Sequence, residues 1–589
     1  MPFDGVLTNC IAKELNAELA GARVDKIHMP EKDEVLIALR GINGNCKLLI
    51  NVNSSMVRVH LTTAKKENPN SPPMFCMLLR KYLVGGRILS ISSYGYERVL
   101  IFEVESSNEL GDRSIKKLIV EIMGKHSNII LINSGGTIID SIFHIDSSIS
   151  SKREVMPARP YEWPPSQNKI SPKDLNQEII LENFKMGKGK IEKVILDLIL
   201  GFSPVLSKEA CFRANMPPQT EIETLETPQL LLLAQQTTKL IGEITNCQWD
   251  PAVYFSDNQK VKPIDFHCVK LSRINDYEKM DTTNHALDTY FNSKIFDDKL
   301  KQSKMALMKV VSSNQDRCEK KLALQQLSIK ESSSFDVNRK LGDILTANIH
   351  QLSSGLENVE LPDFYSEDES LIKIELDKNL TPQRNAQRYY KKYNKLKKTF
   401  EQGNLHATET RRENEYLESL EEAINQANND DDLGEIRLEL TSQNYMSASR
   451  RKDKKDKNSK VVISTPNEYL STDGFTIYSG KNNRQNDLLT LKSSRPDDLW
   501  LHTQKIPGSH VIIKTRGKQI TDRTLEEAAV VSAWNSRAKN SSKVLVDYTQ
   551  VRNVKKPNGA KPGMVTYEKF KTIIVTPDEK IIKKIIANK

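Results

Sequence analysis

Two short polar stretches in the first 130 residues could contact a nucleic acid. Glu97 and Arg98 stand at the start of an expected strand. A carboxylate beside an arginine can hold the guanidinium in one rotamer and present it to a phosphate or a base edge. A surface ion pair with no further role is the alternative. Lys125 and His126 lie in the stretch MGKHSN, where we expect a hairpin tip that contacts an RNA backbone or forms an ordinary turn.

A third polar stretch lies near the C-terminus, where cations alternate with rings. Residues 480–487 read GKNNRQND, and DLWLHTQKIPGSHVIIK at 498–514 and KKPNGAKPGMVTY at 555–567 follow. Cations together with rings are what the recognition of single-stranded or looped RNA needs. The candidate RNA contacts in this stretch are Lys481, Arg484, Trp500, His502 and His510. For Trp500 the alternative is a place in the core, since burial of aromatic rings is common.

The sequence contains no signature of a self-contained active site. It has no Walker loop, no GxSxG and no HExxH motif, and its ten histidines form no pair at metal-ligand spacing beside a carboxylate. The seven cysteines are spread singly, which argues against a disulfide scaffold and against a CxxC zinc site. We therefore expect no catalytic residues, no metal and no cofactor, with an enzyme of unrecognised type as the alternative.

The positive charge of the chain is concentrated near its C-terminus. From residue 450 onward there are 29 Lys and Arg against 14 Asp and Glu, whereas the rest of the chain is slightly acidic. A basic module on a near-neutral body is typical of proteins that bind polyanions, so nucleic acid is the expected partner, with a solubility feature as the alternative. No apolar run approaches the roughly 18 residues of a membrane span, and the N-terminus does not resemble a secretory signal. We expect a cytoplasmic protein without a membrane partner.

The 589 residues are enough for about three to five domains. Residues 1–172 are expected to be α+β, because an amphipathic helix at 4–19 precedes short strand-like runs whose spacing favours an antiparallel meander. A second helix is expected to start at 71–73. It carries Arg80 and Lys81, two weaker candidates for phosphate contacts.

Residues 173–240 are expected to be helical, with a centre at 191–210. Two helices meet there at GFSP, residues 201–204, in a pattern similar to a helix-hairpin-helix, whose hairpin amides can hold a phosphate. An ordinary connection between two helices is an equal alternative, because Ser203 replaces the usual second hairpin glycine.

Residues 276–445 are expected to form a long arm. Helical stretches at 286–352 and 382–427 flank a short acidic segment, and the second stretch shows apolar residues at coiled-coil spacing. These seam residues are Tyr389, Tyr393, Leu396, Phe400, Leu417, Leu420, Ile424 and Ala427. An antiparallel coiled coil with a small tip is expected, with a compact helical bundle as the alternative. A basic linker at 446–460 and an α+β module at 461–589 follow.

Together these stretches resemble the NFACT family, in particular its bacterial RqcH branch, also labelled fibronectin-binding protein A-like, and its eukaryotic relative NEMF. The resemblance covers essentially the whole chain. It is carried by FDG at 3–5, PPMFCMLLRKYLVGGRI at 72–88, EIMGKHSNIIL at 121–131, GFSP at 201–204, STDGFTIYSGKNNRQND at 471–487, DLWLHTQKIPGSHVII at 498–513 and GAKPGMVTY at 559–567.

The resemblance implies an order of domains that matches the regions above. A domain similar to the Fpg/MutM fold comes first, with its later part extending to about residue 271. A helix-hairpin-helix, a coiled-coil arm and an RNA-binding NFACT-R module follow. The resemblance also implies tRNA-recognition residues at Asp4, Glu97 and Arg98. The family has an aspartate where this chain has Glu97, and the added methylene changes the geometry of the pair.

The function implied by the resemblance is ribosome-associated quality control. Such a protein binds a large ribosomal subunit that still holds peptidyl-tRNA, and it recruits alanyl-tRNA for mRNA-independent alanine tailing, which marks the stalled chain for proteolysis. The ribosome supplies the peptide-bond chemistry, and the other implied partner is RqcP, a small RNA-binding helper. Two alternatives stay open: a surface adhesin that binds fibronectin, and a general RNA-binding scaffold without tRNA selectivity.

Overall fold

The computed structural model describes residues 3–41, 44–107, 111–150, 152–256, 262–367, 370–447 and 464–586. The chain divides into two compact units, Met1–Asp297 and Asp298–Lys589. Each unit combines helices with antiparallel sheets, so the expected multidomain α+β architecture is confirmed, while the Fpg/MutM fold of the first domain stays a prediction. Within the described residues, no helix combines the length and the apolarity that a membrane crossing requires.

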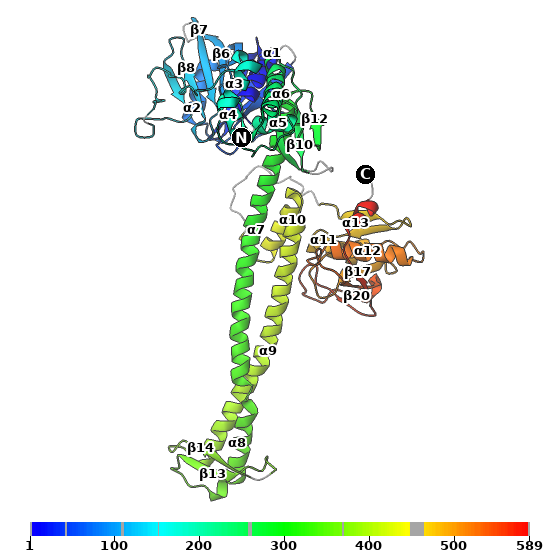
Figure 1. The fold of residues 1–589 in the computed structure, drawn as a ribbon. Helices are drawn as coiled ribbons and strands as arrows, with labels where there is room; N and C mark the ends of the chain where they lie inside the picture. Colours follow the sequence, from blue (N-terminus) through cyan, green and yellow to red (C-terminus); the bar gives the residue numbers. More distant parts are fainter. Residues whose placement is uncertain are drawn as a thin grey trace. The chain divides into compact units, whose positions relative to one another are not determined.

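The first unit is built on a nine-stranded sheet whose neighbouring strands all pair antiparallel (Figure 1). The order β4-β3-β2-β1-β5-β6-β7-β8-β9 joins two meanders where β1 pairs with β5, so the expected meander is confirmed. The strands are β1 (Arg23–Glu31), β2 (Glu34–Gly41), β3 (Gly44–Asn51), β4 (Arg58–Leu61), β5 (Arg87–Ser93), β6 (Val99–Ser107), β7 (Arg113–Glu121), β8 (Asn128–Ile132) and β9 (Ile138–Ser141).

Two helices pack on this sheet. α1 (Gly5–Leu19) contacts β5 and buries Leu7 and Ile11 completely. α2 (Met74–Leu83) contacts β1 and begins directly after Pro73, where the sequence predicts a helix start. The buried residues of α1 recur at helical spacing, so the helix is held mainly by the packing of one apolar face.

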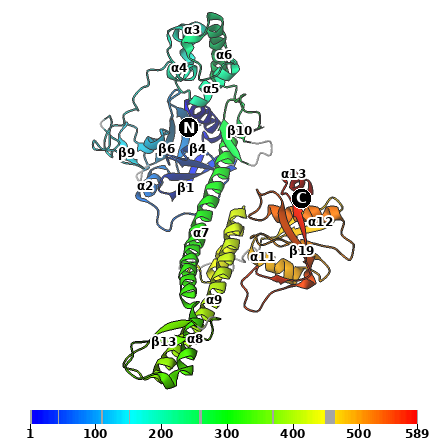
Figure 2. The same ribbon diagram turned by 60° about the horizontal axis from the view of Figure 1, so that its bottom comes forward.

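Four helices follow the sheet in the sequence, and Figure 2 shows them gathered beside one another. They are α3 (Gln177–Met186), α4 (Ile191–Leu198), α5 (Pro204–Arg213) and α6 (Thr227–Thr245). α4 and α5 meet at the GFSP turn, so the two helices expected there are confirmed. The segment before them is tied to the turn, because Ile170 N donates to Leu198 O and Leu200 N donates to Ile170 O, each at 2.9 Å.

After these helices the chain returns to the core of the first unit. β10 (Ala252–Phe255) pairs with β11 (Pro263–His267) and with β12 (Tyr277–Lys279) in a three-stranded sheet. Val253 and Phe266 share one apolar core with α1. β12 lies inside the range 276–445 that was expected for the arm, and the first arm helix begins only at Thr283.

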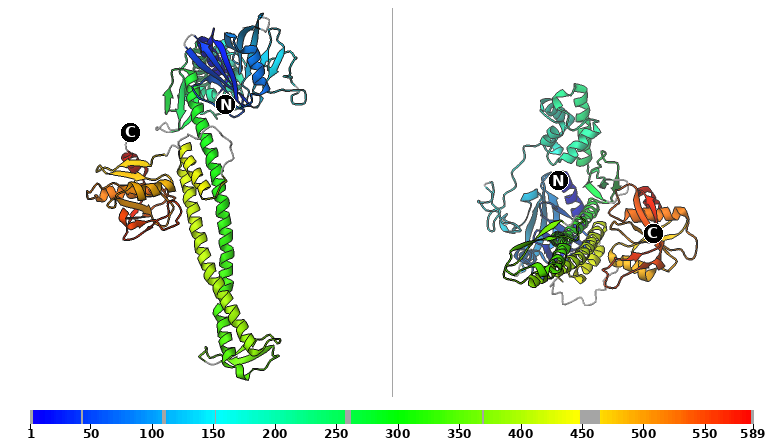
Figure 3. Two further views of the ribbon diagram at one scale, coloured as in Figure 1. Left: turned by 180° about the vertical axis from the view of Figure 1, so that it is seen from behind. Right: turned by 90° about the horizontal axis from the view of Figure 1, so that it is seen from below.

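In the second unit, two long helices run side by side in opposite directions, as Figures 1 and 3 show from different sides. The chain follows α7 (Thr283–Ser332) and α8 (Phe335–Ala347) outward and returns along α9 (Pro382–Gln426). Leu307 and Val311 of α7 pack with Leu417, Leu420 and Ile424 of α9. Phe335 contacts both Tyr393 and Phe400 farther along. The two predicted helical stretches and their seam are therefore confirmed, with a break between α7 and α8.

Short elements complete the arm at its two ends. The hairpin β13 (Asn358–Pro362) and β14 (Leu371–Glu375) packs on α8 as the expected tip. α10 (Asp430–Ser442) follows α9 and folds back on it, burying Leu433 and Ile436.

The C-terminal module has an antiparallel six-stranded sheet in the order β15-β16-β18-β17-β19-β22. α12 (Asp522–Trp534) covers it, and the Thr521 side chain caps its start by accepting a hydrogen bond from Thr524 N. The other elements are β15 (Asn467–Leu470), β16 (Thr476–Ser479), α11 (Asn483–Leu488), β17 (Leu499–Thr503), β18 (Val511–Ile513), β19 (Val544–Gln550), β20 (Val554–Lys555), β21 (Thr566–Tyr567), β22 (Lys571–Val575) and α13 (Glu579–Ile585). Of the basic linker predicted at 446–460, residues 448–460 lie outside the described residues.

Candidate nucleic-acid interface

Four segments meet around a small cavity of about 190 Å³ in the first unit. The start of α1, the loop before β6, the segment before α3 and the GFSP turn all contribute to its walls. The residues predicted from the resemblance, Asp4, Glu97 and Arg98, all line this cavity, so the fold brings them together.

Asp4 is buried, and its carboxylate joins three elements. It is the N-cap of α1 and accepts a hydrogen bond from Leu7 N at 2.9 Å. Its Oδ2 accepts from Ser203 Oγ at 2.6 Å and lies 3.2 Å from His267 Nε2 on β11. Because Asp4 is only 4% exposed, the contacts that the structure shows for it lie inside the protein.

The imidazole of His267 is oriented by its own backbone neighbourhood. His267 Nδ1 accepts a hydrogen bond from Val269 N at 3.0 Å. In the neutral ring the proton then resides on Nε2, which donates to Asp4. Asp4 is therefore surrounded by donors, and its carboxylate clamps the turn and β11 to the start of α1.

The same junction requires two glycines. Gly5 N and Val6 N both donate to Gly201 O, at 3.1 and 3.3 Å. A Cβ on Gly5 would lie 1.8 Å from Tyr96 O, and Gly201 has a φ of +85° with its own Cβ position 2.9 Å from Tyr96 Cβ. Only glycine allows such an approach, which fixes the loop that carries Glu97 and Arg98 against the turn. Ser203, in place of a second glycine, supplies the hydroxyl that holds Asp4.

Glu97 and Arg98 do not form the ion pair that the sequence suggests. Glu97 Oε2 instead accepts from Gln167 Nε2 at 3.1 Å, which ties it to the segment before α3. The Arg98 guanidinium is half-buried and, among the residues that the structure describes, has neither a hydrogen-bond partner nor an ion-pair partner. A cation held at a cavity wall without a protein partner is suited to a phosphate or a base edge.

The turn with Lys125 and His126 lies near the same end of the sheet. Ile122 N donates to Arg98 O at 2.8 Å, and the 3₁₀ turn Gly124–His126 follows directly. Both side chains are exposed, so the expected hairpin tip is confirmed as a connection between β7 and β8. Contact with RNA at this tip stays a prediction.

Sequence reasoning did not single out two residues of the cavity wall or one pair of stacked aromatic rings. Lys169 and Gln167 line the cavity from the segment before α3. Tyr94 and Trp163 stack with ring centroids 4.2 Å apart and an interplanar angle of 9°, and they are 45% and 41% exposed. Large exposed rings can stack on unpaired bases. The pair of rings at 161 and 163 within a Pro-rich polar segment was the only available signal.

The two weaker candidates on α2 differ in their surroundings. Arg80 Nε donates to Ile27 O at 2.8 Å and therefore ties α2 to β1. Lys81 is exposed, and its ammonium lies 5.9 Å from the centre of the Tyr82 ring. A phosphate contact is compatible with Lys81, whereas the contact seen for Arg80 is structural.

In the second unit, the polar stretch expected to bind RNA is largely used to dock the module on the arm. Asn483 Nδ2 donates to Glu439 Oε1 at 3.1 Å and to Ser419 Oγ at 2.9 Å. Lys481 Nζ lies 3.6 Å from a carboxylate oxygen of Asp432. Short amide side chains can donate hydrogen bonds to buried carboxylates, which explains why several asparagines and a glutamine lie close together in this stretch. Of the two cations predicted as RNA contacts in this stretch, Arg484 is exposed.

The three predicted ring contacts are more buried than expected. Trp500, on β17, is 1% exposed and belongs to an apolar core cluster, which agrees with the alternative of a place in the core, while contact with RNA at this ring stays a prediction. His510 is buried and His502 half-buried. Burial lowers the pKa of His502 and holds that of His510 well below its ordinary value, so both are neutral near pH 7. Within the described part of the chain, no group of three or more His, Cys, Asp or Glu is placed to hold a metal ion.

Two family models and several known proteins match this chain in sequence. The family model of the NFACT N-terminal and middle domains matches residues 4–459, and that of the NFACT protein RNA binding domain matches 426–569. The Rqc2 homolog RqcH of Bacillus subtilis (strain 168) is 38% identical over 588 residues, which cover 99% of this chain and 100% of the relative. Human ribosome quality control complex subunit NEMF is 23% identical over 383 residues, which cover 61% of this chain and 34% of NEMF.

Among solved structures, the fibrinogen binding protein from Staphylococcus aureus is 31% identical, with a TM-score of 0.42, over 49% of this chain and 99% of that chain. The family assignment depends on the sequence matches, since one family model spans more than half of the chain and a full-length relative exceeds 30% identity. The chain belongs to the NFACT family.

Proposed function

We propose that the protein acts in ribosome quality control in the cytoplasm, on large ribosomal subunits that still hold peptidyl-tRNA. It recruits alanyl-tRNA for mRNA-independent alanine tailing of the stalled chain, with an RqcP-like helper. The ribosome supplies the peptide-bond chemistry, so the protein is not itself an enzyme. The family, its RNA-binding domain, and the names of the relatives, an Rqc2 homolog and a ribosome quality control complex subunit, support this proposal.

The observation that carries the proposal is the guanidinium of Arg98, which lies at the junction held by Asp4 and has no partner among the residues that the structure describes. We assign Arg98 the direct contact with tRNA and Glu97 an acceptor role at the same wall. Asp4 acts through the geometry of the junction, because its oxygens are already bonded inside the protein. Tyr94 and Trp163 offer rings for an unpaired base of a tRNA loop.

The arm suits a ribosomal partner through its length. α9 has 45 residues, which at 1.5 Å per residue span about 70 Å. Contacts distributed along such a length can add affinity and fix the orientation of the protein on a large particle.

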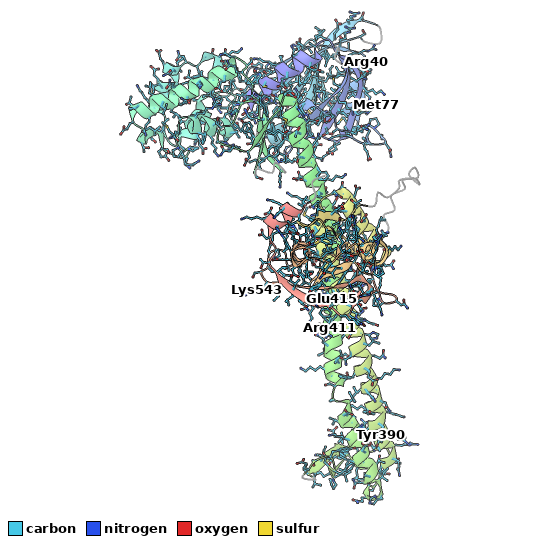
Figure 4. All side chains as sticks on the ribbon, turned by 90° about the vertical axis from the view of Figure 1, so that its right-hand side faces the viewer. Arg40, Met77, Tyr390, Arg411, Glu415 and Lys543 are labelled. Carbon is cyan, nitrogen blue, oxygen red and sulfur yellow. The ribbon has the colours of Figure 1, made fainter. Side chains whose placement is uncertain are left out.

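The test is a pull-down of the tagged protein from lysate at moderate salt, followed by sequencing of the bound RNA. We expect large-subunit RNA together with one enriched tRNA, that for alanine. Arg98→Ala should abolish the enrichment of tRNA and the alanine tails while it leaves the subunit RNA in place. Arg40→Ala is the matched control, because Arg40, labelled in Figure 4, is exposed on β2, pairs with Asp25 at 3.2 Å and is not among the residues that line the cavity.

The other outcomes separate the alternatives. Subunit RNA without a selected tRNA would indicate a general RNA-binding scaffold. Absence of ribosomal RNA, together with detection of the protein on intact cells that bind fibronectin or fibrinogen, would favour the adhesin.

A further inference from the structure

A second and larger cavity, of about 520 Å³, lies in the second unit between the C-terminal module and α9. Its volume falls within the roughly 300–1,000 Å³ of typical small-molecule sites. Four rings line it: Trp500, His502, His510 and Tyr567. The centroids of the other three lie 5.7, 5.2 and 4.8 Å from that of Trp500, so the cavity wall is largely aromatic.

The interior of this cavity is uncharged but has an unsatisfied donor. Both imidazoles are neutral near pH 7, because burial lowers their pKa values. The Trp500 Nε1–H is buried and has no acceptor among the residues that the structure describes. A buried donor without a partner is unfavourable, and a ligand that supplies an acceptor removes that cost.

The rim carries charges of both signs. Glu415 and Glu418 reach it from α9, and Figure 4 labels Glu415 on that helix. Glu418 pairs with Arg537 at 3.6 Å, whereas Glu415 is exposed. Lys505 is also exposed at the rim, and no ion pair involves it within the described ranges. Carboxylates accept hydrogen bonds from amino groups, and a free ammonium attracts a phosphate.

We propose that this cavity binds one unpaired nucleobase that carries an exocyclic amino group, presented by single-stranded RNA. The base lies among the rings and gives an acceptor to Trp500 Nε1–H. Its amino group donates to the carboxylate of Glu415, and the adjoining phosphate meets Lys505. Uracil, which has no exocyclic amino group, is disfavoured because the rim carboxylate then meets a carbonyl oxygen.

RNA fits this arrangement better than a free nucleotide. One ammonium beside two carboxylates is a poor site for a di- or triphosphate, whose charges need several cations. A base within a strand brings only one phosphate to the rim. This inference deepens the RNA-binding part of the proposed function. It rests on the proposed function only where it names RNA as the molecule that supplies the base.

The test uses the full chain labelled with ¹⁵N at tryptophan, which gives four indole signals. Trp500→Phe identifies the signal of Trp500 and removes the donor while keeping a ring. Six-residue oligoadenylate is expected to shift that signal, oligouridylate to bind at least tenfold more weakly, and AMP to bind more weakly than the oligoadenylate. AMP binding as tightly as the oligomer would overturn RNA as the source, and no shift with any of the three would overturn the site.

Lys505→Ala and Lys543→Ala form a matched pair for the phosphate contact. Both lysines are exposed residues of the module with a φ of +55°. Lys543, labelled in Figure 4, is not among the residues that line the cavity. Lys505→Ala should weaken oligoadenylate binding and reduce by about one the slope of log binding constant against log salt concentration. Lys543→Ala should leave the affinity and the slope unchanged. Equal effects would overturn the contact. Association of the unsubstituted protein with large ribosomal subunits is measured in parallel. Absence of that association would count against the proposed function and not against the cavity.

Discussion

Replacement of Asp4 should destabilise the first unit, whereas replacement of Arg98 should not, although both residues line one cavity. Asp4→Ala removes the N-cap of α1, a loss of about 1 kcal/mol. It also leaves Ser203 Oγ and His267 Nε2 without their acceptor, and each buried unpaired donor costs about 1–3 kcal/mol. With relaxation of the Ser203 hydroxyl, we expect a total of about 3 kcal/mol.

Arg98→Ala removes a side chain that has no partner within the described structure, so its effect on stability should stay within about 0.5 kcal/mol. Asp4→Asn is the intermediate case. Its oxygen can keep the cap and Ser203 can turn to accept, but the new amide then faces the Nε2–H of His267, so part of the loss remains.

The assay is thermal unfolding combined with hydrogen exchange of the amides of Gly5 and Val6, which bond to Gly201 O. At about 2–4 °C per kcal/mol, Asp4→Ala should lower the Tm of this unit by about 6–12 °C and release both amides. The reasoning is refuted if Asp4→Ala leaves the Tm unchanged, or if Arg98→Ala lowers it as much. If this result is obtained, loss of alanine tailing in an Asp4 variant indicates a change in the geometry of the junction. Loss of tailing in Arg98→Ala then indicates loss of the proposed contact with tRNA.

Three further outcomes are expected. Gly5→Ala should prevent correct folding of the first unit, because the new Cβ would overlap a backbone oxygen. Gly242→Ala, in α6 with open space around the new Cβ, should raise the free energy of unfolding by about 0.5–1 kcal/mol. The soluble yield and the Tm of each variant check both predictions. Burial raises the pKa of Glu439 to about 7. Docking of the module on the arm should therefore be strongest below about pH 4.5 and should weaken as the pH rises through 7. Energy transfer between labels on α9 and on the module measures the docking, and Glu439→Gln should remove its pH dependence. Tyr94→Ala and Trp163→Ala should each weaken tRNA binding about tenfold with little change in Tm, and unaltered affinity in both would contradict a stacking role.

Local patterns in the sequence were sufficient to predict most secondary structure. The long helices of the arm were predicted because apolar residues repeat at coiled-coil spacing, and the two helices around GFSP because their caps and breakers are adjacent in the chain. β12 was missed, since a strand of three residues has no period to detect and depends on its partner β10. The first arm helix begins at Thr283, close to the predicted start at 286, and β12 occupies the beginning of the range 276–445 predicted for the arm.

The sequence by itself determined that this is a multidomain protein with a basic RNA-binding end, and its motifs identified Asp4, Glu97 and Arg98 as the residues to examine. Only the tertiary structure decided which contacts each one makes. Asp4 meets Ser203 and His267 across 199 and 263 residues of chain, and no local pattern can reveal that these donors occupy its carboxylate. Arg98 remains free within the described structure because Glu97 bonds to Gln167 instead. Burial and partner choice depend on which distant segments pack together, so the difference between a polar group already bonded inside the protein and one without a partner in the described structure appears only in the folded chain.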